Sequence, residues 1–211
     1  MKKVIISAAF LTASIITFAQ SSSHGLSRNN NEVSPLSVTN FNNPDDAQKA
    51  VTEIMNVMGL KQNFILRPAN VSNVEAFVSK RKRYILYNPE FIGWINNSTK
   101  DKWASVALLA HEIGHHLNGH TLGRGVNSQF ELDADEFAGF VMRKLGASLE
   151  QSQRVMYYIA KAEKSETHPA REDRMLAIKI GWSKAAVAPA TTNSEMAINN
   201  HQDSSQNVLS N

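Results

Sequence analysis

The sequence contains no cysteine among its 211 residues. This absence excludes a disulfide framework, a thiolate metal ligand and a cysteine latch over a metal site. It also leaves no cysteine after the amino-terminal segment to carry a lipid. Any metal ion must therefore be held by histidine, aspartate or glutamate side chains.

Long hydrophobic runs are scarce as well. The most apolar stretch, Val4 to Phe18, is interrupted by serine and threonine and is shorter than the roughly 20 residues that span a bilayer. Lys2 and Lys3 precede it and Thr17-Phe18-Ala19 ends it, which is typical of a cleaved secretory signal. We assign residues 1–19 to a signal peptide. The mature chain is then expected to be periplasmic or extracellular and to have no stable membrane span.

The chain also lacks a strong excess of charge of one sign. Its 22 basic and 19 acidic residues give a net charge of +3, and removal of Lys2 and Lys3 with the signal leaves 20 against 19, a net of +1. The only dense basic run is Lys80-Arg81-Lys82-Arg83. Four charges beside a strand are more typical of a solvated edge than of a polyanion site. Nucleic acid is therefore not an expected partner.

The composition indicates one globular domain between two polar ends. Residues 20–43 are rich in serine and asparagine and are predicted to form a flexible amino-terminal segment. Residues 44–182 are long enough for one full core. No aromatic residue follows Trp182, and residues 183–211 are predicted to be a disordered tail.

Periodicity and cap signals predict a helix-rich α+β domain with a small sheet. A helix with an apolar face is expected from Asp45 to Met58, and residues 83–88 form the clearest strand, expected at a sheet edge. A capping box at Ser98 predicts a helix that runs to about Leu117. The other expected elements are short strands at 64–66 and 74–78, and helices at 130–145, 148–164 and 169–181, the last ended by Gly181.

An HExxH motif at residues 111–115 is the pattern that most nearly indicates a reaction. Two histidines four residues apart on a helix lie one turn apart and about 40° around its axis. Both imidazoles can therefore reach one zinc ion. Glu112 lies between them, where a general base is needed to act on water. We predict that His111 and His115 are metal ligands and that Glu112 is the base.

A catalytic zinc site usually has three protein ligands, and the two histidines of HExxH supply only two of them. Glu131 and Asp135 begin the next expected helix and share one of its faces. Glu131 can return to the metal while Asp135 accepts a hydrogen bond from a ligand histidine. The same residues also fit an acidic, solvated helix start that complements the helix dipole. Spacing leaves both readings open.

Two further histidines lie close to the motif. The extended HExxHxxGxxH site needs glycine at position 118 and histidine at 121, where this chain has Asn118 and Thr121. His120 misses that place by one residue, or about 100° on a helix, and His116 is turned by the same angle from His115. We expect neither to be a ligand, and we expect His116 to be a polar neighbour or a surface residue.

Three motifs in order resemble those of the HtpX-like and CAAX-prenyl-protease-like zinc metallopeptidases. They are the HExxH motif, the ExxxD motif from Glu131 to Asp135, and Thr167-His168-Pro169 with Arg174 six residues after His168. Residues 74–78 resemble, more loosely, the segment ahead of that family's edge strand. The resemblance covers residues 74–174, about half of the chain.

The resemblance implies a zincin-like domain with a gluzincin-type site. One zinc ion per chain would be bound by His111, His115 and Glu131, with Glu112 as the general base and Asp135 orienting a ligand histidine. This chain differs from members of that family that span the membrane, because no later segment of it is long and apolar enough to do so.

The resemblance also implies that His168, supported by Arg174, lies near the scissile carbonyl and stabilises the oxyanion. Without the resemblance, a histidine before Pro169 is equally consistent with a helix-start residue of no catalytic role. Arg174 is likewise consistent with an exposed helix residue paired with an acid.

The expected function is therefore hydrolysis of peptide bonds in extended or misfolded exported polypeptides, with the substrate strand pairing with residues 83–88. The alternative is a zinc-stabilised binding or chaperone domain with little or no proteolysis. The presence of Glu112 disfavours this alternative, because a structural zinc site is closed by four ligands and needs no base.

Overall fold

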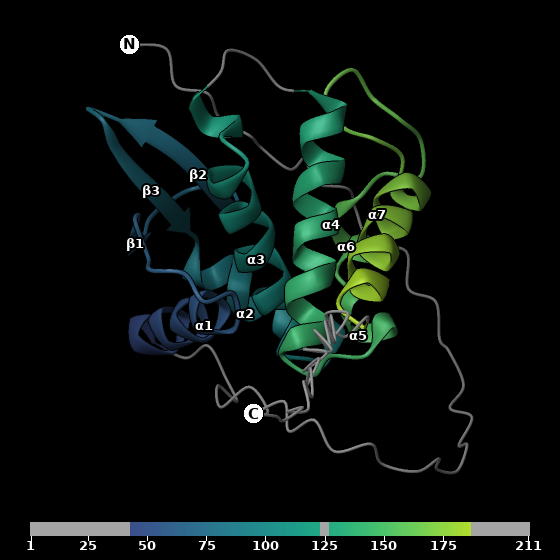
Figure 1. Cartoon of the computed structure of the whole chain (residues 1–211), viewed down its shortest axis with the longest axis horizontal. Coiled ribbons are helices and arrows are strands. Elements are labelled where there is room, and N and C mark those ends of the chain that lie inside the picture. The colour runs from purple at the N-terminus through teal and green to yellow at the C-terminus, as the bar shows by residue number, and fades with distance from the viewer. Residues whose placement is uncertain (1–42, 123–126, 187–211) are drawn as a thin grey trace, which may run out of the picture.

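The structure, a computed structural model, describes residues 43–122 and 127–186. It confirms the α+β class, and one helix, α3 (Trp103–Leu117), stands between a three-stranded sheet and two other long helices, α4 (Ser128–Lys144) and α7 (Arg171–Lys184) (Figure 1). Strand β2 (Val74–Ser79) packs on one side of α3 and helix α4 on another, with α7 against α4. The helix that carries HExxH is thus the centre of the fold.

Several predictions concern residues outside this description. The proposed signal peptide and the tail beyond residue 186 lie outside the described residues. The same holds for the predicted amino-terminal segment, apart from Asn43. Helix α7 continues to Lys184, two residues past the predicted end of the domain. Among the described residues, no helix combines the length and the apolar character that crossing a membrane requires.

Helix α1 (Pro44–Val57) forms almost as its sequence predicts. The side chain of Asn43 accepts a hydrogen bond from the amide of Asp46 at 3.1 Å, and the proline occupies the first helical position. Gly59 follows the end of the helix with φ 67°. The face turned to the core is apolar, and its buried residues are Ala47, Ala50, Val51, Ile54 and Met55.

The sheet has the order β1-β3-β2, formed by Ile65–Pro68, Lys82–Tyr87 and Val74–Ser79 respectively. The prediction that residues 83–88 form an edge strand is therefore wrong. Strand β3 pairs with β1 in parallel and with β2 in an antiparallel hairpin, so it is the central strand of the sheet. The edge next to α3 belongs to β2, because a two-residue turn folds β2 back on the outer side of β3.

Helix α2 (Pro89–Thr99) replaces the expected helix start at Ser98, which lies in its last turn. The side chain of Asn88 accepts hydrogen bonds from the amides of residues 90 and 91, so this asparagine both ends the strand and caps the helix. Helix α3 begins only at Trp103, whose amide donates to the carboxylate of Asp101 at 2.9 Å. The capping box at Ser98 is thus a wrong prediction.

Helices α4 (Ser128–Lys144) and α7 (Arg171–Lys184) form the closest helix pair of the fold. Gly181 lies inside α7, so the prediction that this glycine ends the helix is wrong. A Cβ atom at Gly181 would collide with the carbonyl oxygen of Glu136, and one at Gly139 would collide with that of Ile178. The two glycines therefore allow the backbones to touch, and packing outweighs the low helix propensity of glycine.

The helix expected at 148–164 is interrupted. Its capping box is present, with Ser148 and Gln151 bonded reciprocally, but α5 (Leu149–Gln153) is followed by a separate short helix, α6 (Met156–Ile159). Ala160 is extended, and its carbonyl oxygen accepts two hydrogen bonds from the Arg171 guanidinium at 2.9 and 3.1 Å. A side chain of α7 thus takes the place of the next helical amide.

Candidate metal centre

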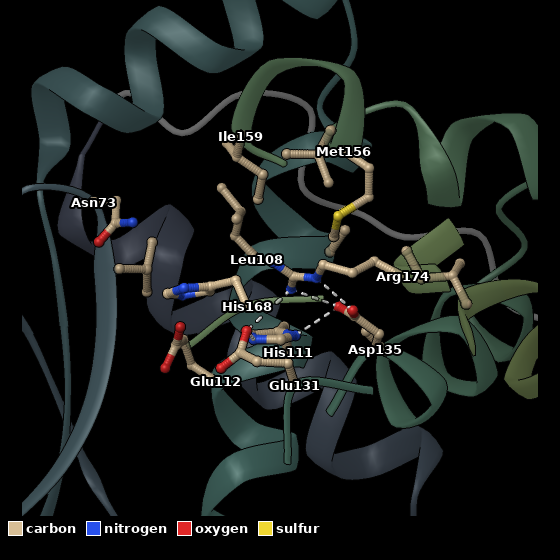
Figure 2. Close-up of a pocket in the computed structure, with 15 residues that line it drawn as sticks. Asn73, Leu108, His111, Glu112, Glu131, Asp135, Met156, Ile159, His168 and Arg174 are labelled. Atoms are coloured by element: carbon tan, nitrogen blue, oxygen red, sulfur yellow. Dashed lines mark hydrogen bonds and ion pairs between the residues drawn. The ribbon is translucent and has the colours of Figure 1, made fainter. Parts of the chain in front are cut away.

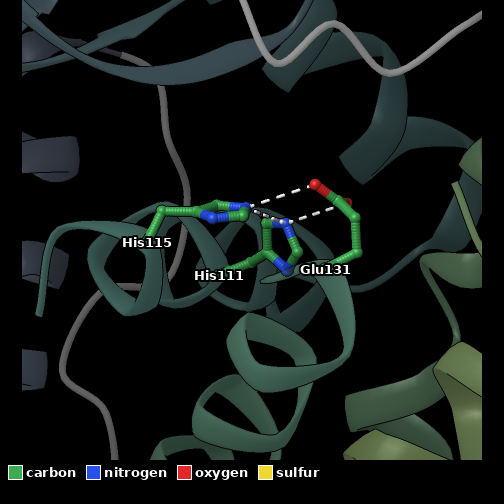
Figure 3. Close-up of side chains that lie close together, drawn as sticks. All are labelled: His111, His115 and Glu131. Carbon is green, nitrogen blue, oxygen red and sulfur yellow. Dashed lines mark hydrogen bonds and ion pairs between the residues drawn. The ribbon is translucent and has the colours of Figure 1, made fainter. Parts of the chain in front are cut away.

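Helix α3 brings two histidines into contact at its buried carboxyl-terminal half. The Nε2 atoms of His111 and His115 are 3.1 Å apart, and the side chains of both residues are almost entirely shielded from solvent (Figure 3). Gly114 lies between them in sequence and faces α4, where an added Cβ would come within 3.2 Å of the Cα atom of Ala134. The glycine permits the close approach of α4 to the two imidazoles.

Glu131, in the first turn of α4, completes the cluster. Its Oε2 atom is 3.5 Å from Nε2 of His111, and its Oε1 atom is 3.4 Å from Nε2 of His115. The carboxylate is 2% exposed, and among the described residues Oε1 has no hydrogen-bond partner. A buried, unsatisfied carboxylate oxygen is costly unless a ligand contacts it. His111, His115 and Glu131 could therefore hold a metal ion.

Asp135 lies one helical turn after Glu131 and backs the first histidine. Its Oδ1 atom is 2.9 Å from Nδ1 of His111, the ring nitrogen that faces away from Glu131. Burial opposes a charged imidazole, but Asp135 and Glu131 together raise the pKa of His111 to about 10. The structure thus places a carboxylate beside the ring nitrogen of His111 that faces away from the cluster, which is the position an orienting carboxylate would need.

Arg174 reaches this carboxylate from α7. Its Nε and Nη2 atoms donate to the two oxygens of Asp135 at 2.6 and 2.9 Å, and Nη2 is 3.4 Å from Oε2 of Glu131. Although burial acts against the charge of Arg174, the two carboxylates raise the pKa of the guanidinium further. Arg174 is 3% exposed, so it is not the exposed helix residue of the alternative reading.

Glu112 points from α3 toward the sheet edge. It is 5% exposed, and its Oε2 atom accepts a hydrogen bond from the amide of Ala76 on β2 at 2.7 Å. Burial is the largest cause that raises the pKa of Glu112, to about 8. A carboxyl group with a pKa near neutrality can both accept and return a proton.

His168 approaches the same place from the segment before α7 (Figure 2). Its Nδ1 atom is 2.7 Å from the Thr167 hydroxyl, whereas Nε2 is buried and has no partner among the described residues. Burial lowers the pKa of His168, so its ring is neutral near pH 7. The structure brings His168 together with Glu112, His111 and Arg174 around one cavity.

That cavity is small. It measures about 20 Å³, which is room for about one water molecule. Polar groups of the cluster form one side, and the opposite side is apolar and includes Leu108, Met156 and Ile159 (Figure 2). A larger ligand requires these walls to move apart.

The sequence did not indicate how His115 is oriented. Its Nδ1 atom is 3.1 Å from Nδ1 of His120, and the ring of His120 stacks on Phe130 at a centroid distance of 4.2 Å. Nε2 of His120 is 3.6 Å from the carboxylate of Asp133 on α4. His120 thus contacts the ring nitrogen of His115 that faces away from the cluster, as Asp135 does for His111, and could orient that ring. The only available signal was its position in the turn that follows α3.

His116 is not a surface residue, because it is completely buried. Its Nε2 atom is 2.9 Å from the carbonyl oxygen of Tyr84, its Nδ1 atom is 3.1 Å from the Thr121 hydroxyl, and its ring stacks on Phe64. His116 therefore joins the end of α3 to the sheet and lies outside the metal cluster.

His120 yields a prediction about metal affinity. We expect His120→Leu to weaken metal binding by about 10- to 100-fold, because the substitution removes the partner that holds the His115 ring. His120→Asn retains a polar atom near the position of Nδ1 and should keep most of the affinity. Competition with a chelator measures both variants. Equal affinity in His120→Leu and the unaltered protein would exclude the orienting role.

Comparison of the chain with protein-family models, with curated proteins and with solved structures found no match.

Proposed function

We propose that this protein is a zinc-dependent endopeptidase with a zincin-like domain. The observation that carries the proposal is the convergence of His111, His115 and Glu131 beside the buried carboxyl group of Glu112 in one cavity. A structural metal site would not need an acid with a raised pKa next to it.

The donor set fits zinc. In a tetrahedral site with ligand bonds of about 2.05 Å, neighbouring ligand atoms are about 3.3 Å apart. The two Nε2 atoms of the cluster are 3.1 Å apart, and each of them lies 3.4 or 3.5 Å from a different oxygen of the Glu131 carboxylate, which is close to that spacing. Two imidazoles and one carboxylate are also a ligand set that zinc uses in peptidases, and zinc binding would displace the proton that the neighbouring carboxylates favour on His111. One ion per chain would therefore be held by His111, His115 and Glu131.

A bound zinc ion supplies a Lewis acid that lowers the pKa of water and polarises the scissile carbonyl group. Glu112 performs the proton transfers. One of its carboxylate oxygens takes the proton from the attacking water, and the same oxygen then gives it to the nitrogen of the leaving amine. The Ala76 amide holds the other oxygen, Oε2, so the carboxylate keeps one orientation through both steps.

His168 is suited to bind the oxyanion. When the Thr167 hydroxyl donates to Nδ1, the proton of the neutral ring lies on Nε2, which lines the cavity without a partner. This N–H can donate to an oxygen that gains negative charge. Arg174 acts differently in this proposal from what the resemblance implies, because its guanidinium is already bonded to Asp135. It positions the carboxylates and does not touch the substrate.

The substrate is proposed to be an extended polypeptide that adds a strand to the free edge of β2. Main-chain pairing of this kind is independent of most side chains and selects unfolded or extended segments. Strand β2 replaces β3 in this role, because β3 has neighbours on both sides. The Ala76 amide on β2 also contacts Glu112, so a peptide on this edge runs past the base.

Substitution of Glu112 tests the mechanism. We expect Glu112→Gln to lower kcat for casein or peptide cleavage by about 100-fold or more, because proton transfer by a positioned base contributes on that order. Its zinc content should stay at one ion per chain, because Glu112 is not a ligand. Metal analysis and a peptide-library assay on the same samples provide both measurements.

The control is Glu90→Gln, which neutralises an exposed acid at the start of α2 and should leave kcat unchanged. Equal activity of Glu112→Gln and the unaltered protein would rule out the assigned base. If the unaltered protein and Glu112→Gln cleave no peptide but suppress aggregation equally, the protein is instead a zinc-stabilised binding domain.

Export remains a proposal that rests on residues 1–19. An amino terminus at Gln20 in the mature protein is the expected result of sequencing it, and a retained amino-terminal segment would contradict the proposal.

A further inference from the structure

The turn between β2 and β3 combines an unfavourable backbone with concentrated positive charge. Lys80 and Arg81 form its two central residues, with φ of 48° and 62°, between the paired residues Ser79 and Lys82. A two-residue hairpin turn with both φ values positive is usually made by Asn-Gly, because residues with long side chains are strained there. Lysine and arginine are therefore poor choices for folding at these positions, which favours a functional reason for them.

The positive charges of the turn have no acidic partner in the described part of the chain. Lys80, Arg81 and Lys82 are exposed, and none of them takes part in an ion pair there. Arg83 differs from them, because its guanidinium donates to the carbonyl oxygen of His116 at 2.9 Å. This bond ties the base of the hairpin to the end of α3, so the three free charges are presented on an anchored hairpin.

The hairpin is continuous with the strand edge that adjoins the metal centre. Ala76, whose amide contacts Glu112, is four residues before Lys80 on the same strand. At about 3.3 Å per residue, the charges begin about 13 Å along the edge from the base. A peptide is expected to pair antiparallel with β2, which is the more stable arrangement. Such a peptide runs in the opposite direction to β2, so the residues beside the hairpin are those on the amino-terminal side of its scissile bond.

We propose that Lys80, Arg81 and Lys82 form a subsite for acidic side chains about three to five residues before the scissile bond. The inference rests on the proposed endopeptidase function and names a substrate class for it: extended polypeptides with aspartate or glutamate at those positions. Attraction is electrostatic and needs no pocket, because the cationic groups are exposed and the backbone of β2 sets the register.

The test uses the full-length zinc-loaded protein and three peptides that share one cleavable core. The first has two glutamates three to five residues before the scissile bond, the second has alanines there, and the third has the glutamates on the opposite side. We expect kcat/KM of the first peptide to exceed that of the second by about 5- to 10-fold, since exposed ion pairs each contribute modestly. The ratio should fall toward one in about 1 M salt, where the Debye length is about 3 Å.

The matched variant is the double substitution Lys80→Asn and Arg81→Gly. It removes two charges and installs the residues that this turn prefers, so the hairpin should remain folded. We expect the variant to lose most of the preference for the first peptide, so that its kcat/KM values for the first and second peptides become similar. Thermal unfolding of the variant confirms that the fold is retained.

Four results would overturn the inference. Cleavage without any preference, or with a preference for the third peptide, overturns the subsite alone. Binding to phosphatidylserine vesicles that the variant loses, with peptide preference unchanged, shows that the hairpin contacts an anionic membrane surface instead. No cleavage of any peptide by the unaltered protein overturns the proposed function, and the subsite falls with it.

Discussion

Gly181→Ala is expected to destabilise the metal-free protein by about 3 kcal/mol or more, because the added methyl group cannot be accommodated between two backbones. Its Cβ atom would collide with the carbonyl oxygen of Glu136 and would lie 3.0 Å from the amide nitrogen of Phe140. Neither group is the end of a flexible side chain, so α7 must move away from α4. Urea or thermal unfolding measures the loss.

Gly93→Ala is the matched control. Gly93 also lies within a helix, α2, but no atom comes within 4 Å of a Cβ built there. Alanine should therefore stabilise the protein by up to about 1 kcal/mol through its higher helix propensity. Opposite signs for the two substitutions are expected. A Gly181→Ala protein as stable as Gly93→Ala would contradict the close packing of α4 and α7.

Arg174→Met is expected to cost about 3–5 kcal/mol, because it leaves the carboxylates of Asp135 and Glu131 buried without their guanidinium partner. Asp135 is completely buried and Arg174 nearly so, and two charge-assisted hydrogen bonds join them. Zinc affinity should fall as well, since Asp135 holds the ring of His111. Unfolding in urea and chelator competition measure the two effects.

Lys184→Met provides the comparison on the same helix. Lys184 pairs with Glu136, but both side chains are substantially exposed, so this substitution should cost at most about 1 kcal/mol. The double variant Arg174→Met, Asp135→Leu should recover part of the stability, because it leaves one buried carboxylate fewer unpaired. A loss of the same size for Arg174→Met and Lys184→Met would show that burial of the Arg174 pair has no energetic consequence.

The local parts of the candidate site could be predicted from sequence. His111 and His115 are four residues apart, and any α-helix places such a pair on one side, so their meeting depends on 3.6-residue periodicity and on nothing distant. The cap at Asn43, the capping box at Ser148 and the position of Gly59 follow in the same way from rules about neighbouring residues. By contrast, tertiary packing decides which segment outside α3 meets the two histidines.

Wrong predictions arose where a local signal competed with a distant one. Ser98 has the pattern of a helix start, yet it lies in the last turn of α2, because Asn88-Pro89 begins a helix earlier in the chain. Gly181 has the pattern of a helix stop, yet its missing side chain serves contact with α4. The strand at residues 83–88 carries flanking charges typical of an edge, yet β1 and β2 enclose it.

The sequence by itself therefore determined the α+β class, the helix that carries His111, Glu112 and His115, and the absence of any thiolate chemistry, because these depend on residue type and on short-range geometry. The tertiary structure decided that Glu131 faces both histidines, that Arg174 is paired with Asp135, and that β2 is the edge strand next to α3. These contacts join residues up to 39 positions apart in the chain. They depend on how closely α3, α4 and α7 can approach, which the glycines at their interfaces permit.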